Sequence, residues 1–332
     1  MKIEFRSIYA PHIKNYIEFK QALGFSLSKV EYVFIQFDRL VLQREEKEVG
    51  ITKELSDILC AKRPNESDGT RYDRVTKLSL FARYLNNMGY PSYIPEIPKF
   101  KSSFIPYIFT KEEISSILTA SDMFCAYKPM PDSYTLVMPT ILRVLYGTGL
   151  RIGEAVNLLE NDVNLSEKYL RIRQSKNGTE RIVPISDSVA DTCKKYQVLK
   201  KTKIRGNIQC KLFFVKDNNT QCCPSSVYRI FRDILRLAGI SHRGKGFGPR
   251  VHDLRHTFAC HSLAQMMESG LDLYQAMPFL STYLGHRTIE STEKYVRLTA
   301  EIYPGLLNDV ENICSFVFPR LNTKSDETNG FL

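Results

Sequence analysis

A proline-rich stretch between residues 91 and 106 is the feature that most limits how this 332-residue chain can fold. Its prolines, at positions 91, 95, 98 and 106, interrupt regular structure because proline fixes φ and has no amide hydrogen. Helical spacing of apolar side chains is visible on both sides of the stretch. The sequence therefore predicts two domains, residues 1–90 and 109–319, with a linker at residues 91–108 and a disordered tail at residues 320–332.

Four helical patterns fill the first of these domains. They cover residues 8–23, 29–43, a shorter stretch that begins after Thr52, and residues 70–88, which together predict a compact all-α domain. The fourth helix carries basic residues between its apolar positions. These side chains form either a solvated face or a set of phosphate contacts, and the pattern leaves both interpretations open; they are Arg71, Arg74, Lys77 and Arg83.

The second domain mixes helical patterns with a β-hairpin. Thr110 and Glu113 have the spacing of a capping box, and further helices are predicted over residues 136–146, 150–159, 187–205 and 225–237. Residues 169–173 and 180–185 alternate in polarity around Asn177-Gly178, a strong hairpin turn. The predicted fold class is mainly α with a small β-sheet. The basic residues of 187–205, Lys200 among them, are expected on a solvated face, with general attraction of DNA as the alternative. Arg181 is either an exposed strand residue or a DNA contact.

Charge and cysteine usage limit the partners of the protein. The formal net charge is +10 and basic residues exceed acidic ones in both halves, which favours a polyanion. The eight cysteines show no zinc-binding spacing, so we expect no metal. No run of apolar residues is long enough to cross a membrane and no secretion leader is visible, so the expected location is the cytoplasm, associated with the nucleoid.

Polar side chains suited to one anionic group cluster in a few short motifs. Residues 147–154 read GTGLRIGE and contain Arg151, and Lys176 stands just before the predicted hairpin turn. His252 and Arg255 lie three residues apart, which places them on one face of a helix. Two arginines, a lysine, two histidines and a tyrosine without a metal cluster indicate phosphoryl transfer to a tyrosine; they are Arg151, Lys176, His252, Arg255, His286 and Tyr295.

The ordered segments GTGLRIGE, HDLRHTFA and LGH, followed by Tyr295, resemble the motifs of the tyrosine recombinases, the phage-integrase family, over about residues 110–304. The resemblance implies a two-domain DNA clamp, in which a helical, SAM-like core-binding domain precedes the catalytic domain. It also implies a site-specific DNA recombinase that forms a 3′-phosphotyrosine and a free 5′ hydroxyl without ATP, cofactor or metal. The implied partners are double-stranded DNA, three further copies in a homotetramer on two sites, and accessory DNA-bending or sibling recombinase proteins.

The resemblance further implies a role for each site residue and leaves alternatives for the whole protein. Arg151 and Arg255 would hold the phosphate, Lys176 would protonate the leaving oxygen, and Tyr295 would attack. His252 is the candidate proton acceptor and His286 the candidate donor to a phosphoryl oxygen, while His256 and His261 are expected to support their neighbours. The expected process is integration, excision or transposition of a mobile element. A type IB topoisomerase and a non-catalytic DNA-binding regulator are the alternatives.

The stretch that follows Tyr295 has a one-sided apolar pattern. Its apolar positions recur at helical spacing, and they are Leu306, Val310, Ile313 and Val317. Such a helix either packs on its own domain or docks on a neighbouring copy, as C-terminal helices do in the family that the sequence resembles.

Overall fold

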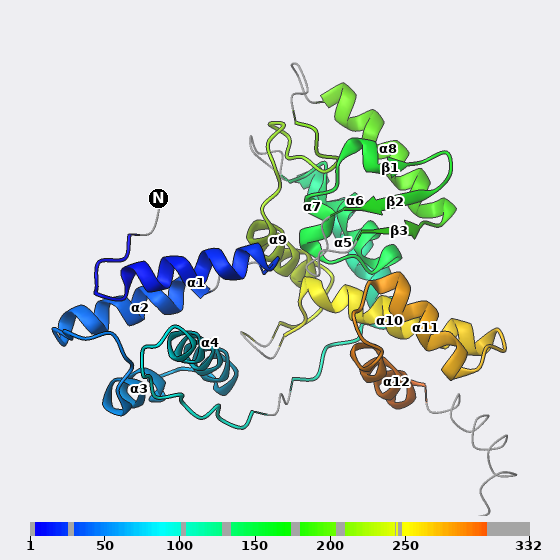
Figure 1. Ribbon diagram of the computed structural model, residues 1–332. Coiled ribbons are helices and arrows are strands. Elements are labelled where there is room, and N and C mark those ends of the chain that lie inside the picture. The colour runs from blue at the N-terminus through cyan, green and yellow to red at the C-terminus, as the bar shows by residue number, and fades with distance from the viewer. Residues whose placement is uncertain are drawn as a thin grey trace, which may run out of the picture. The chain divides into compact units, whose positions relative to one another are not determined.

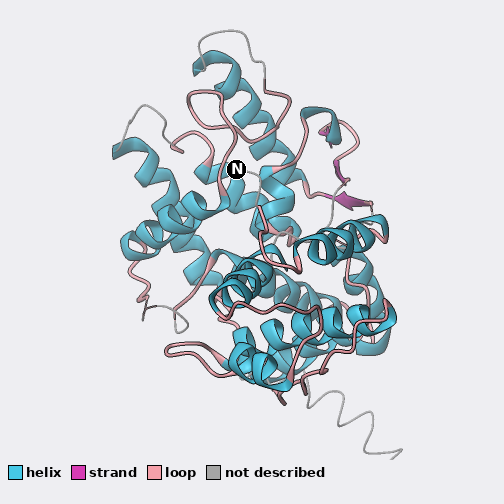
Figure 2. Ribbon diagram, turned by 60° about the vertical axis from the view of Figure 1, so that its left-hand side comes forward, coloured by secondary structure: helices cyan, strands magenta, loops and turns pink. Residues whose placement is uncertain are grey.

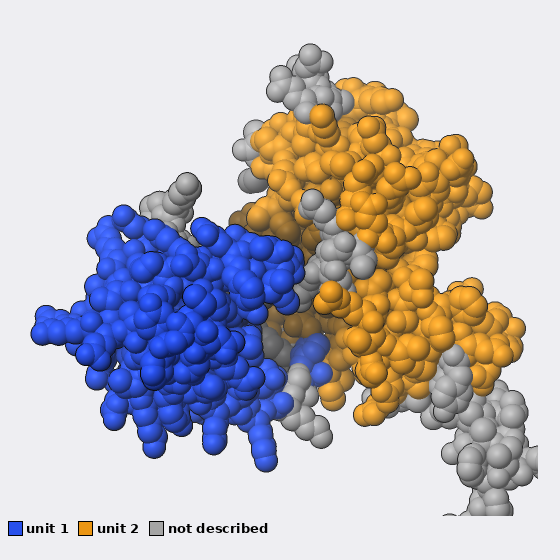
Figure 3. Space-filling model, viewed as in Figure 1, with its two compact units in different colours: residues 1–104 blue, residues 105–332 orange. Residues whose placement is uncertain are grey.

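The computed structural model describes residues 4–25, 30–100, 104–127, 134–173, 180–203, 210–242, 244 and 248–303. It divides into two compact units, residues 1–104 and residues 105–332, which Figure 3 colours separately. Helices make up most of the regular structure, and the short strands occur in the second unit (Figure 2). The mainly α fold class with a small sheet is confirmed. No helix in the described ranges is long and apolar enough to span a membrane.

The first unit consists of helices around an aromatic core. The longest helix, α4, packs against the other three, and Phe81 of α4 lies edge-on to Phe34 and Phe37 at ring-centroid distances of 4.9 and 5.7 Å. Thr52 caps α3 as predicted, because its hydroxyl accepts a hydrogen bond from the Leu55 amide at 3.2 Å. The helices in the described part of this unit are α1 (Ala10–Ala22), α2 (Val30–Gln43), α3 (Lys53–Cys60) and α4 (Asp68–Asn87).

One basic residue of α4 lies inside this unit rather than on its surface. Arg74 is buried and donates to both carboxylate oxygens of Glu66, at 2.7 and 3.0 Å, and to the carbonyl oxygen of Ala61 at 2.9 Å. A buried guanidinium requires such partners because an unpaired charge is costly away from water. For Arg74, both open interpretations, a solvated charge and a phosphate contact, are therefore wrong, whereas Arg83 on the same helix is exposed.

The second unit is built around the long helix α10, which packs against α6, α9, α11 and α12 (Figure 1). Thr110 and Glu113 form the predicted capping box at the start of α5, with hydrogen bonds of 3.1 and 2.9 Å. The helices are α5 (Lys111–Tyr127), α6 (Met138–Thr148), α7 (Ile152–Val156), α8 (Asp187–Lys203), α9 (Pro224–Leu237), α10 (Val251–Glu268), α11 (Leu273–Leu284) and α12 (Glu290–Ile302).

A three-stranded antiparallel sheet in the order β1-β2-β3 lies in the same unit. It comprises β1 (Val163–Asn164), β2 (Tyr169–Ile172) and β3 (Arg181–Pro184). The buried residues Leu170 and Val183 are directly paired, so one face of the hairpin joins the core. Lys176 and the predicted turn between β2 and β3 lie outside the described residues.

Helix α8 departs from the predicted solvated face at one position. Lys200 is buried, and its ammonium donates to the carbonyl oxygens of Leu212 and Phe213 at 2.8 and 3.0 Å and pairs with Glu160 at 3.2 Å. The prediction of a solvated Lys200 is therefore wrong. The side chain instead joins α8 to residues 212–215, of which Phe213, Phe214 and Val215 are buried.

Candidate active site

A tight turn after α6 brings the first arginine motif against α10 and α11. Gly149 ends α6 with φ of +60°, a left-handed conformation that glycine adopts without steric cost. A Cβ atom at this position would collide with the Phe258 ring of α10 and lie 2.9 Å from the Leu284 side chain of α11. The glycine therefore permits the close approach of three helices, directly before Arg151.

Arg151 occupies the N-cap position of α7, a helix of five residues that is shorter than the predicted range of 150–159. Its amide donates to Glu154 at 3.0 Å and its guanidinium donates to the other carboxylate oxygen at 2.8 Å. The Arg151 side chain is 22% exposed, whereas the Glu154 side chain is 3% exposed. Glu154 therefore holds the Arg151 guanidinium in place, and this guanidinium is still accessible from solvent.

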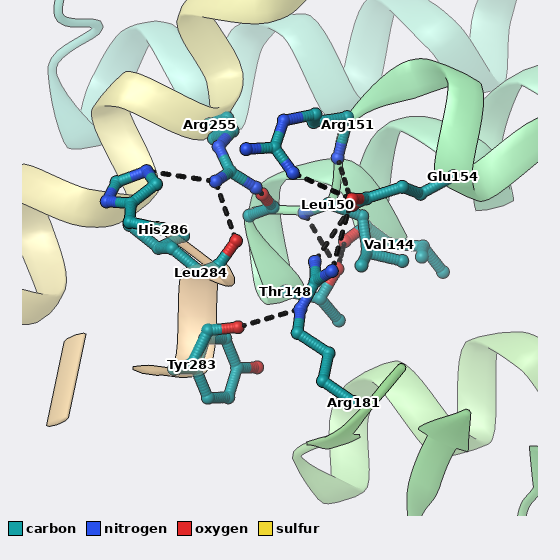
Figure 4. A network of polar contacts seen from close by, with 11 residues as sticks. Val144, Thr148, Leu150, Arg151, Glu154, Arg181, Arg255, Tyr283, Leu284 and His286 are labelled. Atoms are coloured by element: carbon teal, nitrogen blue, oxygen red, sulfur yellow. Dashed lines mark hydrogen bonds and ion pairs between the residues drawn. The ribbon is translucent and has the colours of Figure 1, made fainter. Parts of the chain in front are cut away.

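Glu154 has a second basic partner, Arg181 of β3 (Figure 4). The Arg181 guanidinium donates to both Glu154 oxygens at 3.1 and 2.8 Å and to the Tyr283 carbonyl oxygen at 3.1 Å. Its side chain is only 10% exposed, so the prediction of an exposed strand residue or a DNA contact is wrong for Arg181. Burial would raise the pKa of Glu154, but the hydrogen bond and charge of Arg181 outweigh burial and lower that pKa to about 2.

Arg255 of α10 lies between His286 and Arg151 in the polar network of Figure 4. Its guanidinium donates to the Gly149 carbonyl oxygen at 2.6 Å, to the Leu284 carbonyl oxygen at 2.8 Å and to Nε2 of His286 at 3.1 Å. Burial, followed by repulsion from Arg151, lowers the pKa of Arg255 to about 10, so the group stays charged at neutral pH. Two backbone carbonyls thus fix a buried cation beside Arg151.

The contacts of His286 determine its tautomer. An arginine has no acceptor atom, so Nε2 of His286 must accept the hydrogen bond from Arg255. The ring hydrogen then sits on Nδ1, which donates to the Thr292 hydroxyl of α12 at 2.8 Å. Burial, followed by the charge of Arg255, lowers the pKa of His286 to about 3. Donation from Nε2 to a phosphate therefore requires that the phosphate displace the Arg255 contact and that Nε2 carry a hydrogen. The ring gains that hydrogen either by protonation or by a change of tautomer in which Nδ1 accepts from the Thr292 hydroxyl.

Tyr295 projects from α12 into the same region and is 1% exposed. Its hydroxyl lies 3.0 Å from Nδ1 of His256, and its ring lies nearly parallel to that of His286, at a centroid distance of 6.0 Å and an angle of 16°. Burial raises the pKa of Tyr295 to about 12, and the charge of Arg255 opposes that rise. The phenol is therefore neutral and lies close to both histidine and arginine groups.

The Tyr295 hydroxyl contacts His256, which lies one helical turn beyond His252, the predicted proton acceptor. The His252 ring packs edge-on against the His256 ring at a centroid distance of 4.8 Å. Both imidazoles are neutral, because burial is the largest influence on each and lowers the pKa of His252 to about 4 and that of His256 to about 2. Sequence reasoning gave His256 only a supporting role; its spacing of four residues from His252 was the available signal.

Five of the six predicted site residues lie in the described part of the second unit and surround one region. They are connected by contacts through Gly149, Leu284 and His256, while Lys176 lies outside the described residues. In the described ranges, no group of three or more His, Cys, Asp or Glu side chains is placed to hold a metal ion. The arrangement can hold an anion between Arg151 and Arg255, next to a tyrosine hydroxyl.

Comparison with known sequences gives one family. The phage integrase family matches residues 108–301, more than half of the chain. A putative integrase/recombinase, y4rB, of Sinorhizobium fredii is 28% identical over 313 residues, which cover 92% of this chain and 98% of the relative. The tyrosine recombinase XerA of Pyrococcus furiosus is 32% identical over 163 residues, 48% of this chain and 50% of the relative.

Solved structures share the fold. A lambda integrase dimer bound to a COC′ core site matches with a TM-score of 0.60 at 17% identity, over 85% of this chain and 93% of that chain. The Tn1549 transposon integrase in complex with transposon right end DNA matches with a TM-score of 0.59 at 16% identity, over 84% and 92% of the two chains. The chain therefore belongs to the phage integrase family of tyrosine recombinases, enzymes that cleave and rejoin DNA at specific sites.

Proposed function

We propose that this recombinase cleaves DNA by attack of the Tyr295 hydroxyl on a phosphodiester, which gives a 3′-phosphotyrosine and a free 5′ hydroxyl. The observation that carries the proposal is the 3.0 Å contact between this hydroxyl and His256, in a region that also holds Arg255 and His286. A free phenol is a weak nucleophile at neutral pH, so it needs a proton acceptor and a cationic environment. Both are present around Tyr295.

The proposed roles follow from where charge develops during the reaction. Attack on phosphorus increases the negative charge on the non-bridging oxygens, and fixed guanidinium donors stabilise that charge. Arg151 and Arg255 supply these donors, and Glu154 orients the first of them. His286 donates to a phosphoryl oxygen once its Nε2 atom carries a hydrogen. Lys176, which the sequence places beside the hairpin turn, protonates the leaving 5′ oxygen.

We also propose the biological setting. The relatives include a putative integrase/recombinase and a transposon integrase, so we assign this chain to integration, excision or transposition of a mobile element, in the cytoplasm with the nucleoid DNA. Lambda integrase has been solved as a dimer on a core site and as a tetramer on a Holliday junction. By analogy we propose a homotetramer on two duplex sites, assisted by DNA-bending or sibling recombinase proteins.

Each part of the chain has a place in this proposal. Residues 1–90 form the core-binding domain that grips duplex DNA, residues 91–108 are the linker, residues 109–319 are catalytic and residues 320–332 are a tail. The net charge of +10 supports contact with the phosphate backbone by both domains. The predicted apolar helix at residues 306–317 lies outside the described residues, and we leave both of its packing modes open.

A trapped covalent adduct tests the chemistry. A duplex selected from a random pool by binding to the protein supplies the site, and a nick near the cleavage point lets the short fragment diffuse away so that the adduct accumulates. We expect an adduct with the natural protein and none with Tyr295→Phe, which keeps its DNA affinity. An adduct formed by Tyr295→Phe contradicts the choice of nucleophile. Relaxation of plasmid without exchange between two sites indicates a topoisomerase, and binding without any adduct indicates a regulator.

A further inference from the structure

His256 makes a direct contact with the reacting atom, and the roles proposed above do not yet say which group accepts the proton of that atom. Its side chain is buried in α10, and its Nδ1 atom is 3.0 Å from the Tyr295 hydroxyl oxygen. We propose that His256 is the catalytic group that takes the phenol proton during cleavage, an inference that rests on the proposed function of Tyr295. His252, whose ring packs against His256, then supports this imidazole from the other side.

The geometry meets the first requirement for a general base, which is hydrogen-bond reach of the proton that it removes. If the phenol donates, Nδ1 of His256 carries a lone pair and the ring hydrogen sits on Nε2. A neutral imidazole has this lone pair available, and the buried position of His256 keeps it neutral at physiological pH. Tyr295 therefore has an acceptor in place before any DNA arrives.

The proton and electron movements balance within the named groups. During cleavage the O–H bond of Tyr295 breaks, its proton goes to Nδ1 of His256, and the oxygen electron pair forms the bond to phosphorus. The bond from phosphorus to the 5′ oxygen breaks, and that oxygen takes a proton from Lys176. During rejoining the 5′ hydroxyl returns its proton to Lys176 as it attacks. The tyrosine oxygen then leaves phosphorus and regains its proton from His256.

Substrate binding strengthens this base. Burial is the largest influence that lowers the pKa of His256, and neighbouring basic groups add to it. A phosphodiester anion held by Arg151 and Arg255 offsets the repulsion from these cations, so the pKa of His256 rises towards its ordinary value when DNA is bound. A bound phosphate therefore makes His256 a better proton acceptor than it is in the free protein. The groups that face His256 are His252, Arg250, Arg255, Lys294 and the Tyr295 hydroxyl.

The test compares His256→Asn with two matched variants on the nicked duplex. Asparagine keeps a hydrogen-bonding atom near the position of Nδ1 but cannot take a proton at neutral pH. His261→Asn is the control, because Nδ1 of His261 on the same helix makes an equivalent 3.0 Å contact with the Tyr146 hydroxyl away from the site. His252→Asn tests the other candidate acceptor. The measurements are DNA affinity, thermal stability and the single-turnover rate of adduct formation against pH.

We expect His256→Asn to bind DNA normally and to form adduct about 10²–10³-fold more slowly at neutral pH. Its rate should rise about tenfold per pH unit, because the solution must then ionise the phenol. In this variant, a fluorinated and therefore more acidic tyrosine at position 295 should recover much of the lost rate, because it needs less help to lose its proton. If the substitution had only misplaced the phenol, fluorination would not recover the rate. The inference is overturned if His256→Asn forms adduct at the rate and with the pH profile of the unsubstituted protein. It is also overturned if the slower, pH-dependent and fluorotyrosine-rescued reaction is found in His252→Asn and not in His256→Asn.

A measurement on the unsubstituted protein keeps the inference testable if His256→Asn does not fold. In protein labelled with ¹⁵N at its six histidines, the chemical shift of Nδ1 of His256 distinguishes a lone-pair nitrogen from a protonated one. A lone pair on Nδ1 supports the inference, and a hydrogen there contradicts it. Failure of the proposed function gives different results. An adduct formed by Tyr295→Phe, or the absence of any adduct with the unsubstituted protein, would contradict Tyr295 as the nucleophile and would not test His256 as its base.

Discussion

Replacement of Gly285 by alanine should destabilise the second unit through one identifiable contact. Gly285 follows α11 with φ of +66°, directly before His286. A Cβ atom there would lie 3.0 Å from Cδ and from Nη1 of Arg181, closer than ordinary van der Waals contact. Arg181 must therefore shift, and the same guanidinium donates to Glu154 and to the Tyr283 carbonyl oxygen.

The expected loss has two components. A left-handed conformation costs a non-glycine residue about 1–2 kcal/mol. Weakening one charge-assisted hydrogen bond between the buried side chains of Arg181 and Glu154 costs about 1.5–3 kcal/mol more. We expect Gly285→Ala to lower the free energy of unfolding by about 2.5–5 kcal/mol in total. Gly270 is the matched control, since its φ is +87° but an added Cβ has no neighbouring atom within 4 Å, so Gly270→Ala should show the first component alone.

Urea unfolding of the full chain, followed by far-UV circular dichroism because the sequence has no tryptophan, measures both variants. The double variant Gly285→Ala with Arg181→Ala separates the components, because the smaller side chain leaves room for the new methyl group. In that background Gly285→Ala should cost no more than Gly270→Ala does in the natural protein. Equal costs for the two single glycine variants would refute the assigned role of Arg181.

Two further predictions concern buried charges in the same unit. Lys200→Met should lower the free energy of unfolding by about 2–4 kcal/mol, because the buried carbonyl oxygen of Phe213 and the partly buried one of Leu212 lose their donor. It should leave the salt dependence of DNA binding unchanged. Lys201→Met, at an exposed position, should not alter stability, and an equal loss from both variants would contradict this assignment. The depressed pKa of Glu154, about 2, stabilises the fold above the ordinary carboxylate pKa, and about 3 kcal/mol should disappear as pH falls from about 4.5 to 2. The acid-unfolding curve of Glu154→Gln should be flatter over this range, and an unchanged slope would argue against the pairing with Arg181.

The elements that sequence reasoning located well are those fixed by short-range rules. The capping box of Thr110 and Glu113 and the cap at Thr52 depend on atoms three residues apart, so their sequence spacing is sufficient. The hairpin strands followed from alternating polarity. The proposed site residues were identified from the order of three short motifs along the chain and from the position of Tyr295 after the last of them.

The errors have a common physical origin in partners that are distant along the chain. Arg181 is buried because Glu154, 27 residues earlier, supplies both of its carboxylate oxygens. Lys200 is buried because carbonyls 12 and 13 residues later accept its hydrogen bonds. From sequence periodicity alone, Arg181 and Lys200 cannot be distinguished from the exposed basic residues of the same strand or helix. Only the fold decides which cation turns inward, since a buried charge is tolerated where acceptors converge on it.

The charge balance of the site connects these buried pairs to its reactivity. Glu154 is held ionised between Arg151 and Arg181, so it fixes the first guanidinium. Arg255 is held by neutral carbonyls, which orient the cation and leave its charge largely uncompensated. An anion that enters between Arg151 and Arg255 therefore meets donors that need little reorganisation. Burial is the main cause of the lowered pKa of His256 and of His286, and neighbouring basic groups add to it. In the proposed mechanism, a bound phosphate offsets the charge of these groups and so favours proton transfer from the tyrosine.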